Sequence, residues 1–551
     1  MSQILKTFHL QSRYLHFPVK NGNPKFTLQL WVDGRAAREF NLELATGPGP
    51  QDGGVDWWAF YDVSEFADQT VVVQVVEEDL PDAAARWLES ALQQSDGLIG
   101  ADDLYHERYR PQFHYTARRG WNNDPNGLVY HQGEWHLFYQ HNPFGTGWGN
   151  MHWGHAVNSN LVSWRELPEA LYQKSLADMA YSGSAVVDRA DTAGFQTGAE
   201  APLVTAFTST GRGECLAYSL DRGRTFHEYA GNPYLEHTGR DPKLFWFEPG
   251  RHWVMIVYDE PTGPVASPDQ GGKPDEMGYA IYTSADLRQW TRQDFLPGFF
   301  ECPELFELPV PGRPGETAWV IYGNFAGQFR SAFVTGGFDG KKFSPGIAPA
   351  QAHYGPHFYA AQAFNHAPDG RVIMIGWLSG PLYPEMPFSQ GMTVPLELSL
   401  HRFGQGFRLC FYPVEELAQL RTGSVKGSAL DVEAANRLLA AARGELFDIE
   451  LTLKAANRSP VQLKIGDERI AYDPGDRTIT FAGQTAQLEP AGEEVSLRIL
   501  VDRSVLEVFA NRGEAAFSAI TLLPNGRPEM RLEGSLTISS MAIHTLRSIW
   551  D

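Results

Sequence analysis

The stretch SADLRQW, residues 284–290, indicates how the longest part of this chain folds, because related stretches return along the sequence. It joins turn-forming residues to a large aromatic residue. The other copies are SNLVSW at 159–164, LDRGRTF at 220–226 and FDGKKF at 338–343. Successive copies lie roughly 50–65 residues apart, which is close to the length of one four-stranded blade of a β-propeller. We interpret the aromatic residue that ends each copy as part of a blade core.

Short strand-like segments fill the region from residue 105 to residue 412, and turns rich in Gly, Pro, Asn and Asp separate them. The region holds about 300 residues, which is enough for five blades. We therefore predict an all-β chain whose central domain, 105–412, is a five-bladed β-propeller.

The sequence before the propeller predicts a small β domain over residues 1–80 and a helical linker over 81–104. Residues 26–32 alternate apolar and polar side chains and end at an Asp-Gly pair, which favours a hairpin turn. Pro81 stands at a preferred first position of a helix, and an apolar stripe at helical spacing follows it. We expect a helix of about 14 residues that connects the two domains.

The C-terminal part predicts a β-sandwich over residues 425–551 and a short linker helix over 413–424 that ends the propeller. Strand-like segments at 497–501 and 504–509 are separated by an Asp-Arg pair. A domain of two packed sheets is the simplest architecture for such segments.

Net charge and cysteine content exclude several classes of partner and site. The 551 residues include 45 basic and 66 acidic side chains, a net charge of −21, without a basic run that could bind phosphates. We therefore expect neither nucleic acid nor a membrane surface as a partner. The three cysteines, Cys215, Cys302 and Cys410, form no CxxC pair, so neither a disulfide framework nor a zinc site is expected.

The first residues of the chain carry no targeting signal that we recognise. They lack the continuous apolar stretch of roughly 7–15 residues that a secretory signal needs, and no segment reaches the roughly 18 apolar residues of a membrane span. We therefore expect a cytoplasmic protein, although a secreted or periplasmic protein whose signal had been removed would have the same sequence. The sequence predicts no oligomeric state.

Three acidic residues stand in unusual settings, each close to a proline and each in a different part of the repeat. They are Asp124 within WNNDPNG at 121–127, Asp241 and Glu301. Propeller blades point corresponding ends of their inner strands at the central axis, so the three side chains can meet in one pocket. Each also has a structural alternative: turn chemistry at Asp124, an ion pair between Asp241 and Arg240, and an ordinary strand-end acid at Glu301.

A set of carboxylates suits glycoside hydrolysis, in which one carboxylate attacks the anomeric carbon and a second carboxyl group protonates the leaving oxygen. Asp241 should stay ionised because the neighbouring Arg240 favours its charged form. Glu301 follows two phenylalanines and has no cationic neighbour in sequence, so we expect it to keep its proton and act as the acid. His152 and His155 have a spacing that a metal site could use, but no further ligands accompany them, and we expect neither a metal nor another cofactor.

Taken together, these stretches over residues 105–551 resemble glycoside hydrolase family 32, the β-fructosidases. The resemblance implies that Asp124 is the nucleophile, that Asp241 in an Arg-Asp-Pro motif stabilises the transition state, and that Glu301 in a Glu-Cys motif is the acid/base. Further matching motifs are FYQ at 138–140, WGNMHWGHA at 148–156, YSGS at 181–184 and Gly-Trp at 376–377. The substrate-binding residues that the resemblance implies are Trp121, Asn123, Gln140, Trp148, Tyr181, Ser182, Arg240 and Trp377.

The resemblance implies a retaining, exo-acting β-fructosidase that releases terminal fructose from levan or inulin, with sucrose as a further candidate substrate. His353 occupies a position where the family usually has an acid, and we expect its presence to favour fructan over sucrose. The segment 13–78 resembles a small β domain found ahead of some bacterial levan-active members, and a structural brace is the alternative. Three other functions stay open: an invertase-type sucrose hydrolase, a fructosyltransferase of the same fold, and a carbohydrate-binding propeller without turnover.

Overall fold

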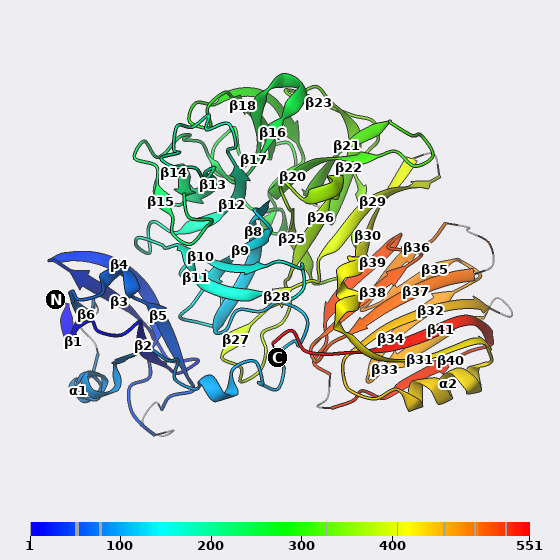
Figure 1. Cartoon of the computed structure of the whole chain (residues 1–551), viewed down its shortest axis with the longest axis horizontal. Helices are drawn as coiled ribbons and strands as arrows, with labels where there is room; N and C mark the ends of the chain where they lie inside the picture. The colour runs from blue at the N-terminus through cyan, green and yellow to red at the C-terminus, as the bar shows by residue number, and fades with distance from the viewer. Residues whose placement is uncertain are drawn as a thin grey trace.

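The computed structural model describes residues 2–49, 54–76, 80–326, 328–404, 406–455, 459–489, 492, 494–523 and 526–550. Figure 1 shows three bodies in chain order, a blue N-terminal domain, a central body from cyan to yellow, and a C-terminal body from yellow to red. Strands dominate all three, and α1 (Asp82–Ala91) and α2 (Val432–Ala441) are the α-helices within these ranges. Within the same ranges, no helix combines the length and the apolar character needed to cross a membrane.

Two small antiparallel sheets share one hydrophobic core in the N-terminal domain. One sheet has the strand order β1-β6-β3-β4 and the other β5-β2-β7. Burial alternates along β3, as the apolar-polar alternation of residues 26–32 predicted. The strands are β1 (Gln3–His9), β2 (Tyr14–Val19), β3 (Lys25–Val32), β4 (Arg35–Glu43), β5 (Trp57–Asp62), β6 (Thr70–Val75) and β7 (Gln93–Ser95).

The segment 81–104 differs from the connector that we expected. Helix α1 has 10 residues and buries Ala84, Ala85 and Leu88 in the core of the N-terminal domain. Strand β7 follows the helix and pairs with β2. Because the apolar stripe of α1 packs on a sheet, this segment is part of the N-terminal domain and not a free linker.

Five antiparallel sheets form the central body. From the innermost strand outward they run β8-β9-β10-β11, β12-β13-β14-β15, β16-β17-β18-β19, β20-β21-β22-β23 and β25-β26-β29-β30. The innermost strands contact one another in cyclic order, including β25 with β8, so the sheets close into a ring. This confirms the predicted five-bladed propeller.

The strands of the propeller have the following bounds: β8 (Gly120–His131), β9 (Glu134–Asn142), β10 (His152–Asn158), β11 (Arg165–Leu171), β12 (Ala180–Val187), β13 (Leu203–Ser209), β14 (Gly213–Ser219), β15 (His227–Glu228), β16 (Gly239–Phe247), β17 (His252–Asp259), β18 (Gly278–Ser284), β19 (Thr291–Pro297), β20 (Phe299–Pro309), β21 (Thr317–Phe325), β22 (Phe329–Phe338), β23 (Phe343–Pro345), β24 (Ala350–Gln351), β25 (Phe358–Ala363), β26 (Ile373–Leu378), β27 (Phe388–Ser389), β28 (Gly391–Met392), β29 (Leu396–Phe403) and β30 (Gly406–Pro413). The short β27 returns to the first blade and runs parallel to β8.

The repeated stretches occupy the turn before the outermost strand of the first four blades. In the third blade, the Asp286 carboxylate accepts hydrogen bonds from the backbone N–H groups of Arg288 and Gln289. The aromatic residue at the end of each stretch packs in or against a hydrophobic cluster, which confirms its role in the blade core. These aromatic residues are Trp164, Phe226, Trp290 and Phe343.

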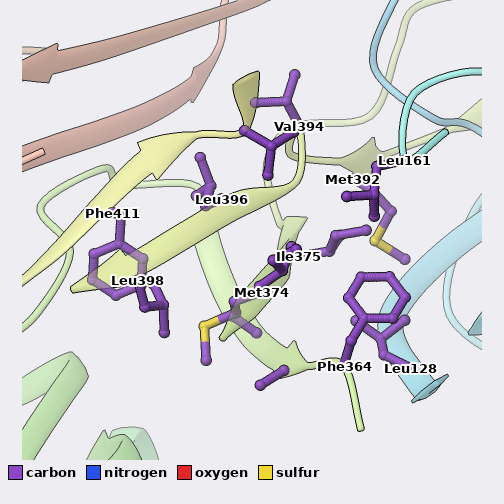
Figure 2. Close-up of a cluster of buried hydrophobic side chains, with 14 of the residues drawn as sticks. Leu128, Leu161, Phe364, Met374, Ile375, Met392, Val394, Leu396, Leu398 and Phe411 are labelled. Carbon is purple, nitrogen blue, oxygen red and sulfur yellow. The ribbon is translucent and has the colours of Figure 1, made fainter. Parts of the chain in front are cut away.

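The largest hydrophobic cluster connects the first blade, the last blade and the C-terminal domain. Figure 2 shows part of it, with Leu128 of β8 close to Phe364, and with Met374 of β26 and Leu396 of β29 in the same space. Phe509 of the last domain belongs to the same cluster. This packing fixes β8, which carries the first of the three candidate catalytic acids.

The C-terminal body has a six-stranded sheet of order β31-β41-β32-β37-β38-β39 and a five-stranded sheet of order β36-β35-β34-β33-β40. One core lies between them, as expected for a sandwich. The predicted helix over 413–424 is only a short 3₁₀ helix, Glu415–Leu420, and β31 begins at Arg421. The strands are β31 (Arg421–Leu430), β32 (Phe447–Ala455), β33 (Val461–Ile465), β34 (Glu468–Asp473), β35 (Thr478–Phe481), β36 (Gln484–Gln487), β37 (Glu494–Val501), β38 (Val505–Ala510), β39 (Ala515–Ile520), β40 (Met530–Glu533) and β41 (Leu536–Leu546).

A buried polar network joins the sandwich to the propeller. The carboxylate of Asp502, between β37 and β38, accepts hydrogen bonds from the backbone N–H groups of Gln112 and Phe113 at 2.8–3.0 Å. The ring of His114 lies between two acids, with Nδ1 2.9 Å from Asp502 Oδ2 and Nε2 3.1 Å from Glu507 Oε2. These contacts hold the segment before β8 in place.

Candidate active site

A pocket of about 220 Å³ is lined by side chains from all five innermost strands of the propeller. Its residues belong to segments that are far apart in the chain. The lining residues are Asn123, Asp124, Gln140, Trp148, Met151, Tyr181, Ser182, Arg240, Asp241, Glu301, Tyr359 and Trp377.

Each innermost strand loses its regular pairing at the residues that line this pocket. The register shifts lie between 122 and 125, 180 and 183, 240 and 243, 300 and 304, and 359 and 362. Such bulges redirect side chains out of the regular alternation of a strand. Asp241 and Glu301 have φ values of 67° and 54°, which are uncommon outside glycine. Because the five irregularities coincide, the side chains converge on one space.

Asp124 lies within β8, and not in the turn that its sequence context predicted. The pairing of β8 with β9 shifts between Asn122 and Pro125, the stretch that contains Asp124, and again between Asn126 and Val129. Pro125 has no N–H to supply to this pairing. The Asp124 backbone N–H donates to Asn123 Oδ1 at 2.8 Å, and the Ser182 hydroxyl donates to Asp124 Oδ2 at 2.6 Å. These contacts restrict the orientation of the carboxyl group.

Glu301 contacts a cation, contrary to our expectation from its sequence neighbours. Arg240 Nη2 donates to Glu301 Oε1 at 2.6 Å, and the Tyr359 hydroxyl donates to Oε2 at 2.7 Å. The guanidinium of Arg240 also lies over the rings of Tyr258 and Phe300, 4.8 and 5.3 Å from their centroids. The local argument that assigned the acid role was therefore wrong, because the fold brings in a cation 61 positions away in sequence. The assignment to Glu301 rests on the resemblance alone.

Asp241 is linked to each of the other two acids through a common neighbour, Cys302 for Asp124 and Arg240 for Glu301. Its Oδ2 accepts from the backbone N–H of Cys302 at 3.1 Å and lies 3.8 Å from Arg240 Nε. The Cys302 sulfur lies 3.7 Å from an oxygen of Asp241 and 3.7 Å from an oxygen of Asp124. Cys302 thus touches two of the carboxyl groups, and Arg240 touches Asp241 and Glu301. The three acids that the sequence singled out therefore face one another.

Burial raises the pKa of two of these acids. Burial and the neighbouring charge of Asp241 raise the pKa of Asp124 to about 8, against the hydrogen bond from Ser182. Burial raises the pKa of Asp241 to about 7, although Arg240 opposes the shift. Our expectation that Arg240 would keep Asp241 fully ionised was therefore wrong, since the loss of hydration outweighs the attraction of one guanidinium.

The predicted substrate-binding residues line the pocket with the exception of Trp121. Trp121 is 6% exposed and makes an edge contact with Trp377, with ring centroids 5.7 Å apart. It therefore supports a ring of the pocket wall without reaching the pocket. The Gln140 amide nitrogen donates to the backbone oxygen of Ala180 at 3.0 Å, which fixes its orientation.

Two pocket residues were not among the sequence-based candidates. Tyr359 donates to Glu301, and its hydroxyl accepts from Asn324 Nδ2 at 3.0 Å. Met151 follows the loop that carries Trp148. Nothing in the sequence around Tyr359 indicates that its hydroxyl reaches an acid. Burial raises the pKa of the Cys302 thiol well above its ordinary value, which argues against a thiolate nucleophile.

His353 lies outside this pocket. It is 2% exposed, its ring stacks on Phe358 at 3.8 Å, and its Nε2 lies 3.3 Å from the Ser518 hydroxyl of the C-terminal domain. The reason for expecting this residue to favour fructan over sucrose was therefore wrong, because the ring packs at a domain interface and does not line the pocket, and the preference itself stays a prediction.

The two histidines at metal-site spacing have separate partners. His152 Nδ1 bonds the backbone oxygen of Asn150, and His155 Nε2 bonds His136 Nδ1. In the part of the chain that the structure describes, no group of three or more His, Cys, Asp or Glu side chains is arranged to hold a metal ion.

Comparisons with known proteins agree with this geometry. Residues 114–413 match the model of the glycosyl hydrolases family 32 N-terminal domain, and residues 416–542 match the model of the family 32 C-terminal domain. A levanase from Bacillus subtilis (strain 168) is 37% identical over 82% of this chain and 72% of its own length. An extracellular exo-inulinase from Aspergillus niger is 29% identical over 81% of this chain and 96% of its own length.

A solved structure leads to the same family. The exo-inulinase from Aspergillus awamori superposes with a TM-score of 0.69 at 27% identity, over 81% of this chain and 100% of that one. With both family models matched in order and the acids of three blades gathered in one pocket, this chain belongs to glycosyl hydrolases family 32.

Proposed function

We propose that this chain is a retaining, exo-acting β-fructosidase that releases terminal fructose from fructans of the levan or inulin type. The observation that carries the proposal is the meeting of Asp124, Asp241 and Glu301, from three separate blades, in one small pocket. The names of the relatives support the substrate class, since they include levanases and exo-inulinases. An invertase from Saccharomyces cerevisiae, 34% identical over 53% of this chain, supports sucrose as a further substrate.

In the proposed reaction, the ionised form of Asp124 attacks the anomeric carbon of the terminal fructosyl unit while Glu301 donates a proton to the departing oxygen. Because burial raises the pKa of Asp124 to about 8, this ionised form is the minor one near neutral pH in the empty pocket, and its fraction grows as the pH rises. The bond between that carbon and the linking oxygen breaks, and its electron pair stays on the oxygen. A water molecule that loses a proton to Glu301 then attacks the same carbon and frees Asp124. Asp241 accepts hydrogen bonds from sugar hydroxyls and stabilises the positive charge that develops on the ring.

The fixed orientation of the nucleophile is a large part of this catalysis. The Ser182 hydroxyl and the irregular backbone of β8 hold Asp124 in one position. A carboxylate that is already oriented loses little freedom when it attacks, and this saving lowers the barrier. The positive φ values of Asp241 and Glu301 fit the same need for fixed geometry.

The shape of the site supports attack at chain ends. A second hollow of about 560 Å³ shares Glu301, Tyr359 and Trp377 with the pocket and also includes Asn324 and Arg330. Glu301 has to protonate the leaving oxygen, which belongs to the remainder of the fructan. That remainder therefore lies next to Glu301, in this second hollow. The pocket itself is the smaller space and holds the terminal unit.

The test is release of fructose from levan, inulin and sucrose by the purified protein, side by side with Asp124→Ala and Glu301→Ala. We expect fructose from the fructans and a loss of several orders of magnitude in turnover for each variant. Thermal unfolding curves check that the variants fold. Near-normal rates in either variant would contradict the assigned roles, and fructosyl transfer as the main product at high substrate would favour the transferase alternative. A protein that binds fructan without releasing fructose would be the non-catalytic propeller.

A further inference from the structure

Trp148 forms part of the pocket wall from a glycine-rich loop. The loop, residues 143–151, joins β9 to β10 and has glycines at 145, 147 and 149. The indole is 54% exposed, and its one aromatic contact among the described residues is an edge contact with Tyr181, with ring centroids 6.3 Å apart. Glycines leave the backbone many conformations, so contacts from outside the loop have to hold the ring in place.

Asn150 connects this loop to the N-terminal domain. Its Oδ1 accepts from the backbone N–H of Asn41 at 2.7 Å, and its Nδ2 donates to the backbone oxygen of Asn41 at 2.8 Å. Asn150 Nδ2 also donates to Asn142 Oδ1 at 2.9 Å, and Asn142 Nδ2 donates to the backbone oxygen of Gly147 at 2.8 Å. Hydrogen bonds therefore run from β4 to the residue next to Trp148.

Phe144 fixes the start of the same loop. Its side chain is fully buried and belongs to the hydrophobic core of the N-terminal domain, although its backbone belongs to the propeller. The ring stacks on Phe40 of β4 at 3.8 Å and 11°, and it contacts Tyr61 of β5 at 5.2 Å. Both ends of the loop thus depend on the N-terminal domain.

The N-terminal domain is also tied to the propeller beyond this loop. Gln173 Nε2 donates to the backbone oxygen of Glu39 at 2.6 Å, and the backbone N–H of Leu176 donates to Glu39 Oε1 at 3.0 Å. The hydroxyl of Tyr61 lies 3.3 Å from His152 Nε2, at the start of β10. The family models begin only at residue 114, so they do not include this domain.

We propose that the N-terminal β domain positions the Trp148 wall of the catalytic pocket, through Asn150 and Phe144, and thereby sets the affinity for fructan. The proposal rests on the proposed function for its substrate. Trp148 lies on the wall of the pocket and takes no part in the contacts that link the three acids. Its placement therefore governs substrate binding more than bond cleavage. Asn150 and Phe144 are accordingly positioning residues.

The first experiment compares Asn150→Ala with Asn41→Ala. Asn150→Ala removes both hydrogen bonds to β4, and we expect the KM for levan or inulin to rise roughly tenfold while kcat changes by less than about threefold. Asn41→Ala is the matched control, because Asn41 contributes only backbone groups to the pair and should leave KM unchanged. Asn150→Asp keeps the acceptor and loses the donor, so it should give an intermediate KM.

The second experiment asks whether Asn150 acts through Trp148. Trp148→Ala alone should raise KM, and adding Asn150→Ala to it should change KM by less than about twofold. The proposal would be overturned if the two substitutions raised KM by independent factors that multiply in the double variant. It would also be overturned if Asn150→Ala had a normal KM. An equal loss of kcat in Asn150→Ala would also overturn it, since that would indicate a disturbed acid cluster.

Hydrogen exchange of the peptide that covers 143–151 gives a readout without substrate. Exchange should be faster in Asn150→Ala and Asn150→Asp than in the wild type and unchanged in Asn41→Ala. Unchanged exchange in both Asn150 variants would refute the positioning role whatever the substrate proves to be. A wild type that releases no fructose from any fructan would instead refute the proposed function, and the exchange result would still decide the role of the N-terminal domain.

Discussion

Replacing Asp124 by Asn should stabilise the folded protein, and the gain should grow as the pH rises. Burial and the charge of Asp241 raise the pKa of Asp124 to about 8, whereas its ordinary value is 3.8. The folded state therefore keeps a proton that the unfolded state releases between these values. The contribution of Asp124 to stability is fully present below the ordinary pKa and is lost as the pH rises through the folded pKa. Asparagine has no proton to lose and avoids this loss.

The size of the effect follows from the shift. At about pH 7 an isolated Asp124 would cost the folded state about 4 kcal/mol, and at about pH 4 only about 0.5 kcal/mol. Asp124 keeps some contact with solvent, and Asp241 and Glu301 share the repulsion, so we take about half of the difference. The variant should therefore gain about 2 kcal/mol between these two pH values, which is about 3 °C for a domain of this size. The Ser182 hydroxyl still finds an acceptor in the amide oxygen.

Scanning calorimetry of the wild type and Asp124→Asn at about pH 4 and about pH 7 measures the difference in stability between the two proteins. The unfolding transition of the propeller is analysed by itself, because the three domains need not unfold together. Glu89→Gln, on the exposed face of α1, is the control for removing an acid without removing a buried one. A gain that is equal at both pH values, or an Asp124→Asn variant that is less stable than the wild type at about pH 7, would refute the reasoning.

Two further predictions concern buried charges outside the pocket. Burial lowers the pKa of His114, but the hydrogen bonds that its ring donates to Asp502 and Glu507 outweigh burial and raise the pKa to about 9, so the stabilisation is present below about pH 6.5 and is lost as the pH rises through about 9. His114→Gln should therefore lower the melting temperature at neutral pH and much less at about pH 10, and equal losses at both would contradict this. Lys243 lies 2.9 Å from the buried Glu304, and Lys243→Met should cost about 3–5 kcal/mol, most of which the double variant with Glu304→Leu should restore in denaturant titrations. A double variant as unstable as the single one would show that the pair contributes more than charge compensation.

Much of the architecture could be predicted from local patterns. The turn that SADLRQW forms depends on Asp286 and its own neighbours in sequence, so its recurrence predicted the blades directly. The three candidate acids could be recognised from the sequence because each lies in a short motif. The backbone irregularity of such a motif has a local cause, such as the proline after Asp124. The helix over 81–104 was found, but its attachment to a sheet was not, since an apolar stripe does not name its partner.

The sequence by itself determined the blade repeat, the β class of all three domains and the candidate acids, because these depend on residues within a few positions of one another. The tertiary structure alone decided which groups surround those acids. Arg240 reaches Glu301 from another blade, His353 packs at a domain interface, and the N-terminal domain holds the loop of Trp148. Burial and the approach of distant charges set pKa values and side-chain positions, and both arise only when strands far apart in the chain close into one ring.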